Sequence, residues 1–175
     1  MVSGVTTHFY IFVVMYPQLK TYYPSFPAYF SLSELTDLYF DNFAISFVSF
    51  SPKEKKDFFG KNVNEKMVEK LEGKILIKAW KELPYTYSNC MLGDFELRAD
   101  GFSGIIMIDN RLSQENNRKY IPKILTGFKN RSTLLLNQFH GTHGRVFWGN
   151  NYKERVIENI EELKDCLASM NIKAK

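Results

Sequence analysis

The sequence predicts an α/β fold, a three-layer sandwich in which helices cover both faces of a mostly parallel sheet of five or six strands. Two observations support this prediction. Short apolar stretches typical of buried strands alternate along the chain with amphipathic stretches typical of helices. The 175 residues, 45% of them hydrophobic, can also bury a core as a single domain over residues 1–175, and no Gly/Ser linker divides them.

Two strands and two helices are expected in the first half of the chain. Apolar, β-branched and aromatic composition predicts a buried strand over 9–16, and capping-box spacing predicts a helix over 31–42. Period-two alternation predicts a strand over 43–50. The motif S-P-K-E then predicts the start of a helix over 51–73. Its apolar positions recur every four residues and should face the core: Phe59, Val63, Met67 and Leu71.

The second half is expected to hold the rest of the sheet and two more helices. The predicted strands are 74–80, a short edge strand within 81–100, then 101–109, 132–138 and 145–148. The predicted helices are 113–128, with Pro122 kinking or splitting it, and 151–170, capped by Asn151. The apolar stripe of the last helix would be formed by Val156, Ile160, Leu163, Leu167 and Met170.

The net charge of +4 is unevenly distributed. Residues 1–50 carry a net charge of −2 and the remaining residues a net charge of +6. This balance is compatible with a nucleic-acid partner, but no arginine-rich run or known motif supports one.

The two cysteines and the apolar runs bear on the compartment. Cys90 and Cys166 form neither a C-x-x-C pair nor a disulfide framework, which predicts free, buried thiols in the cytoplasm or another reducing intracellular compartment. The longest apolar run has eight residues, whereas a membrane span needs about 20. No membrane span is therefore expected.

An aromatic, proline-broken segment over residues 16–30 is the most unusual feature of the composition. Three prolines interrupt any regular element there. The segment can be an arm lying over the core or an exposed surface for a partner protein. Five side chains would form the partner-binding surface: Tyr22, Tyr23, Phe26, Tyr29 and Phe30.

Polar side chains gather where three of the predicted strands end. In a parallel sheet, ligands bind beyond the carboxyl ends of the strands, so these side chains should line one edge. The candidate catalytic residues are Asp109, His140 and His143. The candidate ligand-binding residues of the same edge are Asn110, Asn137, Gln138 and Asn150.

Three chemical interpretations of this edge stay open. Two histidines and a carboxylate can hold a divalent metal such as Zn²⁺ or Fe²⁺. Alternatively, one histidine acts as a general base that Asp109 orients, although no G-x-S-x-G nucleophile turn is present. The third interpretation is that these polar residues cap helices and satisfy loop backbone groups. No cofactor is predicted, with a divalent metal as the alternative.

From Gly101 onward the layout resembles the second half of a Ras-like small GTPase domain. A strand ending in Asp109 leads to a helix, and the next predicted strand ends at Asn137, where the family has its N-K-x-D motif. Gln138 and His140 stand where the family has Lys and Asp, and no phosphate-binding loop follows the first strand. The resemblance therefore implies a degenerate domain that kept the scaffold and lost the nucleotide.

The absence of any complete catalytic or phosphate-binding motif favours a non-catalytic protein-binding or assembly module on an α/β scaffold. The alternative is a metal- or His-assisted hydrolase acting on a phosphoester through Asp109, His140 and His143. A third class, a basic nucleic-acid-binding protein, would need its lysines and arginines on one face.

Overall fold

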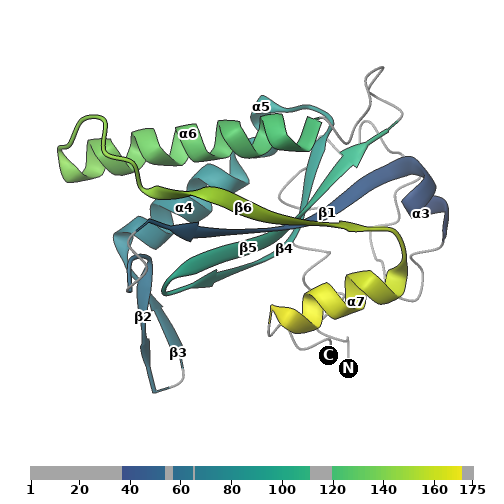
Figure 1. Cartoon of the computed structure of the whole chain (residues 1–175), viewed down its shortest axis with the longest axis horizontal. Helices are drawn as coiled ribbons and strands as arrows, with labels where there is room; N and C mark the ends of the chain where they lie inside the picture. Colours follow the sequence, from purple (N-terminus) through teal and green to yellow (C-terminus); the bar gives the residue numbers. More distant parts are fainter. Residues whose placement is uncertain (1–36, 54–56, 65, 111–119, 171–175) are drawn as a thin grey trace. The chain divides into compact units, whose positions relative to one another are not determined.

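The computed structural model describes residues 37–53, 57–64, 66–110 and 120–170 (Figure 1). The chain divides into two compact units, one formed by Met1–Asn42 with Ile157–Lys175 and the other by Phe43–Val156. The helices are α3 (Asp37–Asn42), α4 (Leu71–Lys81), α5 (Leu83–Thr86), α6 (Tyr120–His140) and α7 (Ile160–Ser169). The strands are β1 (Phe43–Pro52), β2 (Gly60–Val63), β3 (Lys66–Glu69), β4 (Cys90–Arg98), β5 (Gly101–Asp109) and β6 (Trp148–Ile157). The predicted single domain over 1–175 is not tested by this division and stays a prediction.

Among the described residues, the main sheet has four strands in the order β4-β5-β1-β6, and it is antiparallel. β5 pairs antiparallel with both β1 and β4. Between β1 and β6, the Lys53 amide donates to the Phe147 carbonyl at 2.7 Å, while the Ser46 hydroxyl donates to Glu154 at 3.1 Å. From Ser46 to Lys53 the residue number rises along β1, while that of the partner falls from Glu154 to Phe147. β1 and β6 therefore also run in opposite directions.

The predicted mostly parallel sheet is therefore wrong, and so is the GTPase-like layout. Only Ala99 and Asp100 separate β4 from β5, so the two strands form a hairpin. A parallel pair would need a long crossover between its strands.

The Phe43–Val156 unit has two layers instead of the three predicted, because α4 and α6 cover the same face of the sheet (Figure 1). Trp80 of α4 and Phe128 of α6 both pack on Phe102 of β5, with ring centroids 4.8 Å and 5.9 Å away. The Trp80 and Phe128 rings also meet edge to face at 5.4 Å. All three side chains are completely buried, so this aromatic contact forms the centre of the core.

Two glycines allow the layers to approach closely. A Cβ at Gly104 in β5 would lie 2.6 Å from the Trp80 indole, so only glycine leaves room for that ring. Gly73, predicted to end a helix, lies instead in the first turn of α4, where a Cβ would meet the Phe59 carbonyl at 2.5 Å. At both positions the close packing is possible only because glycine has no side chain.

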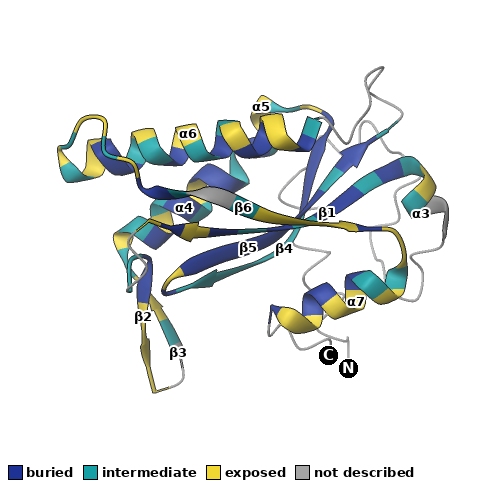
Figure 2. Cartoon of the chain, in the orientation of Figure 1, coloured by how far each residue is buried: buried dark blue, intermediate teal, exposed yellow. Residues whose placement is uncertain are grey.

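The helix predicted over 51–73 is replaced by a small antiparallel hairpin, β2–β3 (Figure 2). Of its four predicted core positions, Phe59 is buried, but Val63 and Leu71 are 50% and 56% exposed. The four-residue apolar spacing therefore did not indicate a helix. The Phe59 amide instead donates a hydrogen bond to the Ala99 carbonyl, and the Phe59 carbonyl accepts one from the Lys70 amide.

Two predicted strands are helical. Residues 74–80 lie in α4, whose buried side is formed by Gly73, Leu76, Ala79 and Trp80. Residues 132–138 lie in α6, which runs on to His140 because its buried stripe continues through Ser132, Leu136 and Asn137. Helical spacing of the buried positions governs both segments, whereas short apolar runs alone do not separate buried strands from buried helices.

The last strand and helix are displaced relative to the prediction. The predicted strand 145–148 overlaps β6 only at Trp148, and β6 continues to Ile157. The last helix is capped by Asn159, whose side chain accepts the Glu162 amide at 3.0 Å, and not by Asn151. Its predicted apolar positions Leu163, Leu167 and Met170 are buried, while Val156 lies in β6 and is exposed.

Several predictions are confirmed. β5 spans the predicted residues and is almost continuously buried (Figure 2), β1 contains the predicted strand 43–50, and β4 is an edge strand within 81–100. α3 lies within the predicted helix 31–42. Cys90 and Cys166 are buried and form no disulfide. The strand 9–16 and the segment 16–30 lie outside the described residues.

Candidate nucleic-acid interface

The structure places Asp109 and His140 at opposite ends of the sheet. Asp109 is buried and pairs with Phe43, the first residue of β1. His140 stacks on Phe147, whose carbonyl accepts the amide of Lys53, just beyond the other end of β1. β1 has ten residues and is therefore about 30 Å long. The two side chains cannot serve one catalytic centre.

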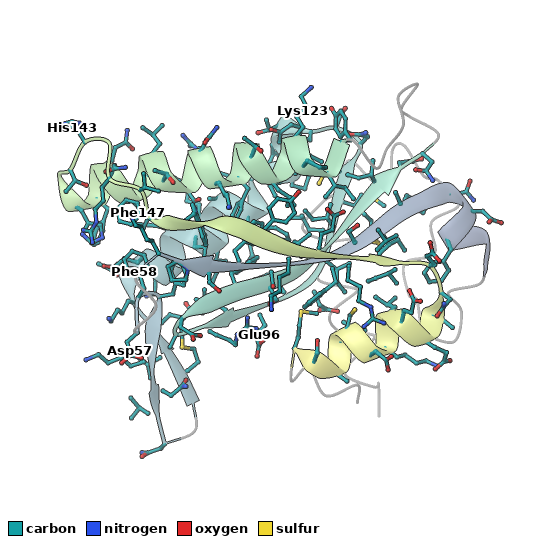
Figure 3. All side chains as sticks on the ribbon, in the orientation of Figure 1. Asp57, Phe58, Glu96, Lys123, His143 and Phe147 are labelled. Carbon is teal, nitrogen blue, oxygen red and sulfur yellow. The ribbon has the colours of Figure 1, made fainter. Side chains whose placement is uncertain are left out.

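Within the described ranges, no three His, Cys, Asp or Glu side chains are grouped closely enough to hold a metal ion. The predicted trio of Asp109, His140 and His143 thus does not converge. His143 is exposed in the turn after α6, between Gly141 and Gly144, which both have positive φ (Figure 3). Catalytic or metal-binding roles for these residues stay predictions that no comparison tests, as does the divalent cofactor.

Asn137 ties the turn after α6 to the helix. Its amide group donates to the carbonyls of Thr133 and Arg145, at 3.1 Å and 3.0 Å. Its side-chain oxygen accepts the Thr142 hydroxyl at 2.7 Å and the Arg145 amide at 3.2 Å. This buried side chain therefore acts as a structural clamp that fixes the position of Arg145.

The other residues of the predicted ligand edge are dispersed. Gln138 is exposed on α6, Asn110 follows β5 at the opposite end, and Asn150 lies in β6. The structure brings together His140 and Asn137, which belong to the same end of α6, but it does not assemble the predicted edge.

A cluster of aromatic and cationic side chains occupies the end of the sheet where His140 lies (Figure 3). We call it the Phe147 cluster, and it consists of Phe58, Phe139, His140, Arg145 and Phe147. The buried Phe147 ring is its centre. The His140 ring stacks on it at 5.8 Å, the Phe58 ring lies at 5.7 Å, and the Arg145 guanidinium at 5.1 Å.

One member of this cluster, Phe139, is exposed, whereas the Nε2 atom of His140 is buried. Phe139 packs edge to face on His140 at 5.0 Å and is 44% exposed. The Nε2 atom of His140 lies 3.4 Å from a carboxylate oxygen of Glu72 and makes no hydrogen bond. An exposed aromatic ring can stack on a base, and a guanidinium can contact phosphate.

Lys129 and Tyr152 form a second aromatic–cationic contact, between α6 and β6. The Lys129 ammonium lies 5.9 Å from the Phe50 ring centroid and 5.8 Å from that of Tyr152, and it donates to the Gly149 carbonyl at 3.0 Å. Burial lowers the pKa of Lys129, and burial together with the Glu154 carboxylate raises the pKa of Tyr152. Burial thus disfavours the ammonium form of Lys129 and the phenolate form of Tyr152.

Burial also raises the pKa of the Cys90 thiol well above its usual value. A nucleophilic cysteine needs its thiolate form, so Cys90 is a structural residue of the core.

The positive charge of the chain is concentrated in one of its compact units. Between Phe43 and Val156 the sequence holds 19 Lys and Arg against 12 Asp and Glu, a net charge of +7. The remaining residues therefore carry a net charge of −3. A unit with this excess attracts polyanions.

Sequence reasoning missed the Phe147 cluster because residues 145–148 were assigned to a strand. The cluster combines Phe58, before β2, with residues after position 138, so their proximity depends on the sheet. One signal was available, since cationic and aromatic residues are interleaved in the stretch F-H-G-T-H-G-R-V-F.

The comparisons with known proteins rest on the fold. No protein-family model matches the chain, and no curated protein matches it. A solved REP-associated tyrosine transposase bound to a REP hairpin matches with a TM-score of 0.52 and 8% sequence identity. The match covers 74% of this chain and 65% of that chain, so this chain spans about two thirds of the length of that transposase.

A protein of Deinococcus radiodurans R1 assigned as a transposase matches with a TM-score of 0.47 and 12% identity, over 75% of this chain and 92% of that one. The first match shows that this chain shares its fold with a transposase. The sequence-based prediction of a non-catalytic protein-binding module is wrong, because the structural match is to a nucleic-acid-acting enzyme.

Among the described residues, no helix is long and apolar enough to cross a membrane.

Proposed function

We propose that the Phe43–Val156 unit binds a DNA hairpin and that the chain acts on DNA as a strand-processing enzyme. One observation carries the proposal: the fold matches that of a tyrosine transposase solved in complex with a REP hairpin. A shared fold alone does not fix a function. The charge and the Phe147 cluster supply support that is independent of the likeness.

The charge supports a nucleic-acid partner because the excess lies in the unit that forms the sheet. A net charge of +7 between Phe43 and Val156 provides the phosphate-binding contribution that dominates the affinity of most DNA-binding proteins. The Arg145 guanidinium lies over the Phe147 ring, so some of this charge belongs to the Phe147 cluster.

The Phe147 cluster supports a hairpin over a continuous duplex. Bases in a hairpin loop are unpaired, and proteins bind such bases by stacking them on aromatic rings. Phe139 is the exposed ring of the cluster, and the Asn137 clamp holds the backbone of Arg145, whose guanidinium lies over Phe147. In this arrangement the loop bases stack on Phe139 while the guanidinium of Arg145 contacts the backbone.

Fluorescence anisotropy with a labelled DNA hairpin tests the binding part of the proposal. The full chain should bind the hairpin more tightly than a duplex of the same stem closed by blunt ends. Equal affinity for the two probes would contradict the role of the loop bases.

The enzymatic part is tested separately. When a tyrosine oxygen attacks a phosphodiester, a phosphorus–oxygen bond to the protein forms and a sugar hydroxyl leaves. Denaturing electrophoresis of the labelled hairpin, incubated with the chain and Mg²⁺ or Mn²⁺, should reveal a shortened strand or a covalent protein–DNA adduct. A hairpin that is bound but stays intact and unattached would contradict catalysis and leave the binding proposal standing.

A further inference from the structure

The β2–β3 hairpin extends away from the four-stranded sheet at the end where the Phe147 cluster lies (Figures 1 and 3). Its base is firmly attached to the core. Phe59, directly before β2, is completely buried, and its amide donates to the Ala99 carbonyl at 3.0 Å. The Lys70 amide, directly after β3, donates to the Phe59 carbonyl at 2.9 Å. The Phe58 ring contacts Phe147, so the hairpin is continuous with the candidate interface.

The register of the hairpin separates its residues into two different faces. Lys61 pairs with Val68 and Val63 pairs with Lys66, and these four positions share one face. The other face holds Gly60, Asn62, Met67 and Glu69. One face therefore carries two lysine positions and two valines, and the acidic residue of β3 lies on the other.

The valine–lysine face is open to solvent in this structure. Val63 is 50% exposed, Val68 is 53% exposed, and Lys61 is exposed as well. Across the other face, Gly60 and Met67 pack so closely that a Cβ at Gly60 would clash with the Met67 side chain. The hairpin thus presents an apolar and cationic face that the described residues of its own unit leave accessible.

We propose that the β2–β3 hairpin enters the major groove of a DNA stem and contacts it through Lys61, Val63 and Val68. The inference rests on the proposed function and deepens it. In it the β2–β3 hairpin binds the stem of the DNA, and the Phe147 cluster binds the bases of the DNA loop. The major groove of B-DNA admits a two-stranded β-ribbon. The exposed Lys61 complements the phosphates that border the groove.

The valines define what is read in the groove. The only apolar group that a base presents there is the C5-methyl of thymine, and valine side chains can bury it. The proposal therefore predicts a preference for thymine-containing stems through Val63 and Val68, while Lys61 contributes a salt-dependent contact.

The experiment compares two DNA hairpins with a stem of about ten base pairs, one helical turn. The first has A·T pairs along the stem, and the second carries deoxyuridine in place of every stem thymidine. The unaltered full chain should lose about fourfold in affinity on the second probe for each buried methyl group. The Val63→Ser/Val68→Ser variant should bind both probes equally. Val156→Ser, an exposed valine in β6, is the matched control and should discriminate like the unaltered chain.

A second pair of variants tests the proposed contact of Lys61 with the DNA phosphates. Lys61→Ala should reduce the slope of log affinity against log salt by about one. Lys78→Ala, on α4 and outside the hairpin, should leave that slope unchanged. The thermal midpoints of all variants establish that they are folded.

The outcomes separate this inference from the function on which it rests. The groove contact is overturned if the unaltered chain binds both probes equally, or if the Val63→Ser/Val68→Ser variant still binds the thymidine probe more tightly. In either case the proposed binding of a DNA hairpin stands. If the unaltered chain binds neither probe, the proposed function and the groove contact fail together.

Discussion

The rings of His140 and Phe147 stack with their centroids 5.8 Å apart and their planes at 23°, which joins the end of α6 to the residue before β6. His140 is therefore part of an aromatic cluster at one end of the sheet, and Asp109 lies at the other end.

Arg145→Ala should weaken binding of a DNA hairpin and lower the salt slope by about one, because in the proposed function its guanidinium contacts the phosphate backbone. Titrations of the labelled hairpin at several salt concentrations measure both quantities. Arg131→Ala is the matched control, since Arg131 is exposed on α6 and pairs with Glu82 at 3.3 Å. Equal salt slopes for the two variants would rule out Arg145 as a phosphate contact.

Asn137→Ala should lower the free energy of unfolding by about 1–3 kcal/mol, because it removes the four hydrogen bonds by which the Asn137 side chain holds Thr133, Thr142 and Arg145. Gln138→Ala, the exposed neighbour, should change it by less than about 0.5 kcal/mol. Urea denaturation of both variants compares them directly. A clamp role for Asn137 would be refuted by two equally stable variants.

Gly104→Ala should destabilise the fold by about 1–3 kcal/mol, since the new methyl group would push the Trp80 indole out of its position. At Gly149 in β6 a Cβ would lie 3.4 Å from the nearest heavy atom, the Ser51 carbonyl oxygen, so Gly149→Ala should be tolerated. Thermal unfolding followed by Trp fluorescence reports both effects. If Gly104→Ala is as stable as Gly149→Ala, the close contact of α4 with β5 is incorrect.

Stability at alkaline pH should depend on Tyr152. Its pKa is raised in the folded state by burial and by Glu154, so the neutral phenol contributes stability that is fully present below the unfolded pKa of about 10. That contribution is lost as the pH rises from about 10 through the higher folded pKa. Denaturation at pH 9 to 11 should therefore show a shallower loss of stability in Tyr152→Phe than in the unaltered chain. Identical slopes would contradict the raised pKa.

The fold could be predicted from the sequence only where the pattern had one interpretation. β5 was assigned correctly because the seven residues between Gly101 and Asp109 are all apolar or small. Residues 74–80 and 132–138 were assigned to strands although they are helical, because a short apolar run fits both structures. The parallel sheet followed from those two errors, since helices read as strands imitate a strand–helix alternation.

The candidate site could not be predicted for a different reason. The predicted edge assumed that strands ending in Asp109 and Asn137 are parallel neighbours, and Asn137 is instead in a helix. The contact of Phe58 with Phe147 joins residues far apart in the sequence, and only the pairing of β1 with β6 brings them together.

The affinity of the full chain for a DNA hairpin, measured over a range of salt concentrations, tests the central claim most directly. The account predicts that the logarithm of the affinity falls linearly with the logarithm of the salt concentration, with a slope of about −0.9 for each phosphate contacted. No measurable binding at low salt, or an affinity that salt does not change, would contradict it.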